Sequence, residues 1–134
     1  MTHSLVLSLF LAGCAHAGQT NSDRVVLHHA LPAELGAGSS LQLVEVAYAP
    51  GGSSGPHHHP CPGAVYVVSG AIRTQLAGGA ETVYRAGQSF YESPTDVHLI
   101  SANASTETGA RFVAFFVCRD DAPLSVPASA GVGR

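Results

Sequence analysis

Apolar and polar residues alternate along several short segments of this chain, and turn-forming residues separate these segments. Residues 41–49 show the clearest alternation, which places Val44, Val46 and Tyr48 on one face. Such alternation is typical of a half-buried β-strand, because successive side chains of a strand point to opposite faces. Further strands are predicted over residues 24–30, 66–68, 71–76, 81–85, 89–92, 98–101 and 111–118.

The segments between the predicted strands are rich in glycine, proline and small polar residues. Gly78-Gly79 lies between two predicted strands, and a Gly-Gly pair in that place is typical of a tight β-hairpin. No segment has the period of an amphipathic helix, and the chain from Arg119 onward is predicted to be loose. Many short strands with evenly spaced turns predict an all-β sandwich or barrel.

The first residues have the pattern of a targeting segment. Residues 5–11 are continuously apolar but too few to span a bilayer, which takes about 20 residues. Small residues follow, as in a secretory leader. Leu11-Ala12-Gly13-Cys14 resembles a bacterial lipobox with a lipid anchor on Cys14, whereas Ala15-His16-Ala17 fits ordinary signal-peptidase cleavage. We expect a leader at residues 1–17 and an exported bacterial protein, either periplasmic or a membrane-anchored lipoprotein.

Chain length indicates the number of domains, and net charge limits the expected partners. Without the leader about 117 residues remain, which suits one domain, expected over residues 24–127 with a loose tail at 128–134. The net charge is −3, and the chain contains no lysine. Nucleic acids and anionic membranes are bound by basic surfaces, so neither is an expected partner.

Three histidines stand in a row at residues 57–59. On an extended strand, His57 and His59 share one face while His58 points away. Two neutral imidazoles one strand pitch apart can bind one ion of iron, copper, zinc or nickel. Such a pair needs a further donor, and His98, which follows another predicted strand and turn, is the candidate.

The sequence around these histidines resembles the two motifs of the cupin family. Gly51, His57, His59 and Gly70 fall on the first motif, and Gly87 and His98 fall on the second. The resemblance covers residues 25–127 and implies the cupin jelly-roll barrel, a double-stranded β-helix, with the three histidines converging on a metal inside it. It also implies a small-molecule ligand or substrate and, as in many cupins, a homodimer.

Three features depart from the family pattern. Gly63 stands in place of the metal-binding glutamate, and Ala102 stands in place of the asparagine, with Asn103 one residue later. Ser93-Pro94-Thr95 replaces the usual Pro-x-Gly turn. Because a β-branched residue avoids positive φ, we predict that Asp96 rather than Thr95 takes that conformation.

The loss of the glutamate bears on the chemistry. Three histidines leave a divalent transition metal (iron, or manganese, nickel, copper or zinc) with its full charge, which favours an anionic, chelating ligand. Cupin thiol dioxygenases resemble this arrangement, which implies an oxygen-dependent dioxygenase-like enzyme acting on a small anionic molecule. The alternative is a non-catalytic module that binds a metal or small ligand. Glu92 or Gln75 is an alternative replacement ligand, although an ordinary strand-end role is favoured for Glu92. No catalytic residue is assigned.

Two cysteines lie within the expected domain. In an exported protein Cys61 and Cys118 can form a disulfide, but the sequence does not show that they meet, and two unpaired thiols are favoured. Cys61 is also close enough to His59 in sequence to be considered as a metal ligand.

Overall fold

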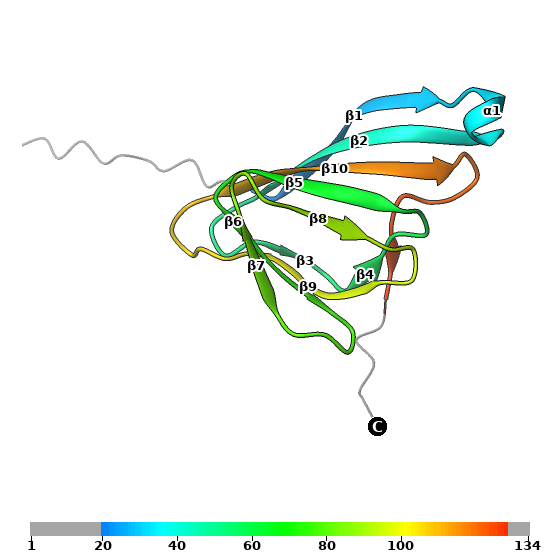
Figure 1. Cartoon of the computed structure of the whole chain (residues 1–134). Helices are drawn as coiled ribbons and strands as arrows, with labels where there is room; N and C mark the ends of the chain where they lie inside the picture. The colour runs from blue at the N-terminus through cyan, green and yellow to red at the C-terminus, as the bar shows by residue number, and fades with distance from the viewer. Residues whose placement is uncertain (1–19, 129–134) are drawn as a thin grey trace, which may run out of the picture.

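The computed structural model describes residues 20–128 and consists of two β-sheets that face each other (Figure 1). The elements are β1 Ser22–Ala30, α1 Ala33–Gly36, β2 Ser39–Tyr48, β3 Ser53–Ser54, β4 His57–His58, β5 Gly63–Ser69, β6 Ala71–Leu76, β7 Thr82–Arg85, β8 Ser89–Glu92, β9 Val97–Asn103, β10 Ala110–Arg119 and β11 Val126–Pro127. Strands therefore dominate, and the only helix among the described residues is one turn long.

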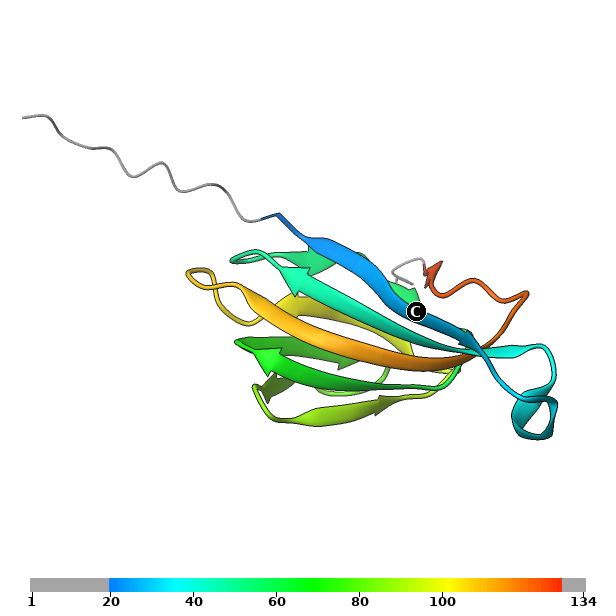
Figure 2. The ribbon, with the colours of Figure 1, turned by 90° about the horizontal axis from the view of Figure 1, so that it is seen from above.

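Every strand pairing is antiparallel. One sheet has the order β1-β2-β10-β5-β8, which Figure 2 shows from above, and the other has the order β11-β4-β9-β6-β7 with β3 paired to β9. The predicted all-β jelly-roll architecture is confirmed, and β6 and β7 form the predicted hairpin around Gly78. Within residues 20–128, no helix is long and apolar enough to cross a membrane.

The core lies between the sheets and is built by alternate residues of the central strands. In β10, Ala110, Phe112, Ala114, Phe116 and Cys118 are buried, whereas the residues between them are more exposed. Val44 and Tyr48 of β2 and Val65 and Val67 of β5 complete the same interior. The strand period of two therefore sends one apolar set inward, as the sequence pattern predicts for Val44 and Tyr48.

Asn103 is buried at the end of β9 and ties two turns together. Its Nδ2 donates hydrogen bonds to the carbonyl oxygens of Ala49 (2.9 Å) and Thr108 (2.7 Å), and its Oδ1 accepts one from the N–H of Ser105 (2.9 Å). These three bonds satisfy most of the hydrogen-bonding capacity of a buried amide. The asparagine displaced by one residue thus fixes the loop that leads to the histidines.

The segment after β10 is ordered up to Ala128, which corrects the prediction that the chain is loose from Arg119 onward. β11 pairs with β4, and the N–H of Ala128 donates to the carbonyl oxygen of Pro56 (2.9 Å). A two-residue strand that ends in proline has no alternation to recognise, so the sequence pattern does not reveal it. The predicted leader (1–17) and all but one residue of the predicted tail (128–134) lie outside the described residues.

Candidate metal centre

The three histidines proposed from the sequence lie together between the sheets. β4 places His57 directly opposite His98 of β9, and opposite side chains of an antiparallel pair share a face. The two rings are stacked with centroids 5.2 Å apart, and the ring of His59 lies 5.0 Å from His57 and 6.0 Å from His98. His57 and His59 line the adjacent cavity, whereas His98 and His58 do not. His58 differs from His98 in its register, because it lies opposite Val97 and not in the His57–His98 pair.

Two of these rings are held by a hydrogen bond from Nδ1, and the third has a hydroxyl near its Nδ1 atom. His57 Nδ1 donates to the carbonyl oxygen of Gly55 (2.8 Å) and His59 Nδ1 to that of Leu124 (2.7 Å). His98 Nδ1 lies 3.5 Å from the hydroxyl of Thr74. Because the other ring nitrogen of a metal-binding histidine usually donates to such a group, this arrangement leaves Nε2 as the atom for a ligand.

Glu92, at the end of β8, brings a carboxyl group to the same place. Its side chain is buried, with Oε1 3.3 Å from His98 Nε2 and Oε2 4.0 Å from His59 Nε2. Among the described residues, neither Glu92 Oε2 nor His98 Nε2 has a hydrogen-bond partner. Unsatisfied buried polar atoms are rare in folded proteins, so this pair requires an explanation.

Burial disfavours the charged forms of both Glu92 and His98. Desolvation, and then the nearby Asp96 charge, raises the pKa of Glu92 to about 7. Desolvation, followed by repulsion from His57 and His59, lowers the pKa of His98 to about 4. The pKa of His59 is also lowered, mainly by burial. In the metal-free protein, Glu92 and His98 are therefore both neutral over most of the interval between these values, and their contact is not an ion pair.

We predict that Glu92→Gln changes how stability depends on pH in the metal-free protein. A raised pKa gives Glu92 a stabilising contribution that is complete below pH 4.5 and is lost as the pH rises through about 7. The unfolding free energy of the variant minus that of the wild type should therefore increase by up to about 3 kcal/mol from acidic to alkaline pH. Denaturant titrations across that range measure it, and a constant difference would show that folding does not raise the pKa of Glu92.

The donor set suits a divalent transition metal. A nitrogen about 2.1 Å from a metal puts its ring centroid about 3 Å away, so rings around one ion lie about 4.5–5.5 Å apart. The separations of 5.0 Å and 5.2 Å from His57 fall within this range, whereas the 6.0 Å between His59 and His98 exceeds it. Imidazole and carboxylate are ordinary ligands of such metals. Within residues 20–128, no group of three or more potential ligands already has the spacing of a finished site, so binding requires side-chain adjustment.

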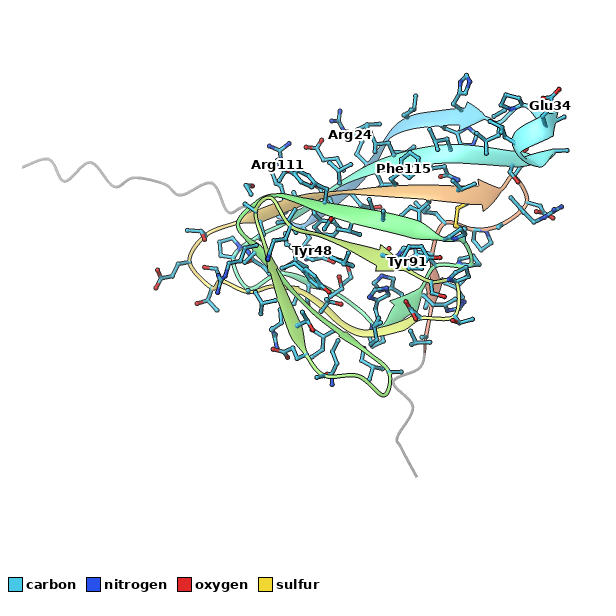
Figure 3. All side chains as sticks on the ribbon, in the orientation of Figure 1. Arg24, Glu34, Tyr48, Tyr91, Arg111 and Phe115 are labelled. Carbon is cyan, nitrogen blue, oxygen red and sulfur yellow. A yellow bond between two sulfur atoms is a disulfide. The ribbon has the colours of Figure 1, made fainter. Side chains whose placement is uncertain are left out.

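A cavity of about 410 Å³ adjoins the histidines. Its walls include apolar residues of β2 and β10, and its polar part includes Tyr48, whose hydroxyl is 2.5 Å from Ser54 Oγ and 3.0 Å from Ser101 Oγ. Figure 3 shows Tyr48 between the layers, whereas Arg24, Arg111 and Phe115 lie on the outer side of the five-stranded sheet. An apolar cavity with a few polar groups is the usual form of a small-molecule site.

Comparison with protein families decides the class of this chain. Residues 44–116, more than half of the chain, match the family model described as the cupin domain. The chain belongs to the cupin family. No curated protein matches its sequence significantly.

Several solved structures share this cupin fold. A protein with a double-stranded β-helix domain from Klebsiella pneumoniae has a TM-score of 0.62 at 21% identity, over 95% of this chain and 99% of that one. The polyketide cyclase RemF from Streptomyces resistomycificus has a TM-score of 0.61 at 18% identity, over 86% and 75%. Oxalate oxidase has a TM-score of 0.56 at 26% identity, over 66% of this chain and 46% of that one. This cupin therefore spans about half the length of oxalate oxidase.

The cysteines of this cupin are paired, which corrects the interpretation of two free thiols. Cys61 and Cys118 form a disulfide, visible as a yellow bond at the end of β10 in Figure 3. The bond excludes Cys61 as a metal ligand in the oxidised protein. The sequence does not reveal the pairing because it depends on the register between the loop after His59 and the end of β10.

The turn before His98 also differs from expectation. No residue other than glycine has a positive φ in the described part of the chain, so neither Thr95 nor Asp96 takes the left-handed conformation. Instead, Asp96 N–H donates to the carbonyl oxygen of Ser93 (2.9 Å), and Asp96 Oδ2 accepts from Ser93 N–H (2.9 Å). The aspartate carboxylate closes the turn, which removes the need for a glycine.

Gln75, the other residue considered as a replacement ligand, lies away from the histidines' cavity. Its side chain donates to the carbonyl oxygen of Gly79 in the hairpin and lines no part of that cavity.

Proposed function

We propose that this cupin is a metal-dependent enzyme of the cell envelope, with oxygen-dependent, dioxygenase-like activity on a small molecule that carries one anionic group. His57, His59 and His98 would hold a divalent transition metal. The observation that carries the proposal is the orientation of the three rings, whose Nδ1 atoms contact the protein and whose Nε2 atoms are left for a ligand. Non-catalytic binding of a metal or small ligand is the alternative.

The chain's own residues would shape and orient the substrate. When bound, the metal would supply a Lewis acid with open positions for oxygen and substrate. The apolar walls would exclude water from the reacting group; they comprise Val44, Val46, Phe112, Ala114 and Phe116. The hydroxyl cluster of Tyr48, Ser54 and Ser101 can exchange hydrogen bonds with a polar group at the other end of the substrate.

The cavity charges restrict the substrate. The described residues that line it include no arginine or lysine, and its two carboxylic acids are Asp23 and Glu92. A second anionic group on the substrate would therefore be desolvated without a positive partner, which is costly. We propose that a single anionic group binds at the metal and that the rest of the substrate is neutral.

Replacing any of the three histidines should remove metal, and replacing their neighbour should not. We expect His57→Ala, His59→Ala and His98→Ala each to weaken binding at least ~100-fold, because loss of a direct ligand should cost at least as much as loss of a supporting residue. The matched control, His58→Ala, keeps His57 and His59 but alters a residue that lies opposite Val97 and not in the His57–His98 pair. Metal content after dialysis measures the result. Equal losses in His58→Ala and His57→Ala would show that the run binds metal as a loose loop.

An oxygen-consumption screen tests the activity itself. The iron-loaded protein is offered small thiols, diketones and hydroxy acids that carry one anionic group, with the matching dianions as controls. Oxygen uptake that depends on substrate and is lost in His98→Ala supports the proposal. Stoichiometric metal without turnover of any of these substrates would favour the non-catalytic alternative.

The disulfide supports the proposed location. Structural disulfides persist in oxidising compartments such as the periplasm and are rare in the cytosol. The Cys61–Cys118 bond is therefore what an exported protein would be expected to contain. The lipid anchor at Cys14 and the homodimer stay predictions.

A further inference from the structure

We propose that Glu92 is a fourth, anionic ligand of this metal centre, provided from β8 in place of the glutamate that the family pattern has at position 63. The inference rests on the proposed three-histidine site and adds a residue to it. Four observations carry the inference: strand register, the space around Gly63, the surroundings of Glu92 and the charges nearby.

The register of β5 and β8 brings the two positions side by side. Gly63 of β5 and Glu92 of β8 are directly opposite each other in the antiparallel ladder. Opposite residues point to the same face, with Cβ atoms about 4.5–5.5 Å apart. A side chain at residue 92 therefore enters the interior beside the position where a side chain at residue 63 would enter it.

The space next to Gly63 is already filled. A Cβ atom at this residue would overlap the ring of Phe116, at 2.5 Å from its Cε1 atom. Phe116 is 2% exposed, and its ring centroid is 4.5 Å from that of His59. The phenylalanine thus occupies the volume that a glutamate at residue 63 would need, so that residue cannot provide the carboxylate unless the ring moves.

The surroundings of Glu92 differ from those of an ordinary residue at a strand end. Such a glutamate normally points into solvent, but Glu92 is 6% exposed. Its oxygens face the Nε2 atoms of His98 and His59, and its Oε2 has no hydrogen-bond donor among the described residues. Its side chain is thus directed at the atoms that the Nδ1 contacts leave for a ligand.

A metal ion would let Glu92 take its ionised form. A buried carboxylate needs a cation or several donors beside it, and no arginine or lysine of the described chain pairs with Glu92, so without a metal the group is held neutral. A divalent ion among the Nε2 atoms would provide that charge and would also give His98 Nε2 the partner that it lacks. With Glu92 bound, the centre carries one net positive charge, which matches a substrate with one anionic group.

The test compares metal binding by the full chain after removal of metal with a chelator. Wild type, Glu92→Gln and the control Glu81→Gln are titrated with Co²⁺ alone at neutral pH, by calorimetry and visible absorption. Glu81 is a half-exposed carboxylate on the β6–β7 hairpin, paired with Arg73. We expect Glu92→Gln to lose at least ~10-fold in affinity and to change the Co²⁺ spectrum, and Glu81→Gln to match the wild type.

The possible outcomes separate the two proposals. If Glu92→Gln binds Co²⁺ with wild-type affinity and spectrum while His98→Ala does not bind it, Glu92 is not a ligand and the three-histidine site stands. If the wild type binds no metal, the proposed function fails and the Glu92 inference with it. Glu92→Asp keeps the carboxylate and should retain part of the affinity, also where the glutamine variant fails to fold. Affinity and a Co²⁺ spectrum unchanged in Glu92→Asp would contradict ligation at residue 92, because a ligand shortened by one methylene cannot keep the same metal geometry.

Discussion

The Cys61→Ser/Cys118→Ser double variant is expected to be about 4 kcal/mol less stable than the wild-type protein. The disulfide joins residues 57 positions apart. In the chain-entropy model, a cross-link of that span lowers the conformational entropy of the unfolded chain and so raises the free energy of unfolding by about 4 kcal/mol. Both sulfur atoms belong to fully or nearly buried residues, so the serine hydroxyls would also lie in an apolar environment. Denaturant unfolding followed by circular dichroism measures the difference.

Reductant provides the control for this experiment. Excess dithiothreitol should destabilise the wild type by a similar amount and leave the double variant unchanged, because only the wild type contains the bond. A double variant within about 1 kcal/mol of the wild type would show that the loop closed by Cys61 and Cys118 contributes little, against the chain-entropy expectation.

Restoring the family glutamate at residue 63 is expected to damage the protein rather than improve its metal site. Gly63→Glu would push a side chain against the buried ring of Phe116 and the carbonyl oxygen of Phe115, 3.2 Å from the new Cβ atom. Overpacking costs about 1–3 kcal/mol, and a second buried carboxylate beside Glu92 adds a like charge. We expect a total loss of stability of about 4 kcal/mol or more, measured by denaturant unfolding.

Two further variants identify the cause of that loss. Ala64→Glu places the same charge on the next residue of β5, which is exposed, and should change stability by less than about 1 kcal/mol. In a double-mutant cycle, Gly63→Glu should cost less in a Phe116→Ala background, because the ring that blocks it is gone. Additive costs would mean that Phe116 is not the obstacle.

The strands and the three histidines could be predicted from local sequence. Alternation places Val44 and Tyr48 inward because side-chain direction in a strand depends only on position along it. The same parity places His57 and His59 on one face, and the family motif adds His98. Their role as ligands stays a prediction that the histidine variants will test.

The remaining features depend on which strands pair and in what register. The alignment of Gly63 with Glu92, the Cys61–Cys118 bond and the carbonyl of Leu124 beside His59 each join segments that are distant in sequence. The local pattern tells which face of a strand is buried, but it does not tell which distant segments pair with each other. For that reason the sequence predicts an ordinary strand-end role for Glu92, although in the structure its carboxyl group lies beside two of the histidines.

The hydrogen bond between His59 and Leu124 determines when, during synthesis and folding, this histidine takes its final orientation. A chain that emerges residue by residue presents the histidine run long before the carbonyl 65 residues later that orients it. An unorganised cluster of histidines binds metals in the Irving–Williams order and so prefers copper to iron or manganese, whereas a folded cavity can impose its own geometry. At the proposed metal site, selection among metals would therefore begin only when β11 has closed against β4. The proposed site would then choose among the metals of the compartment where folding finishes, rather than of the compartment where synthesis begins.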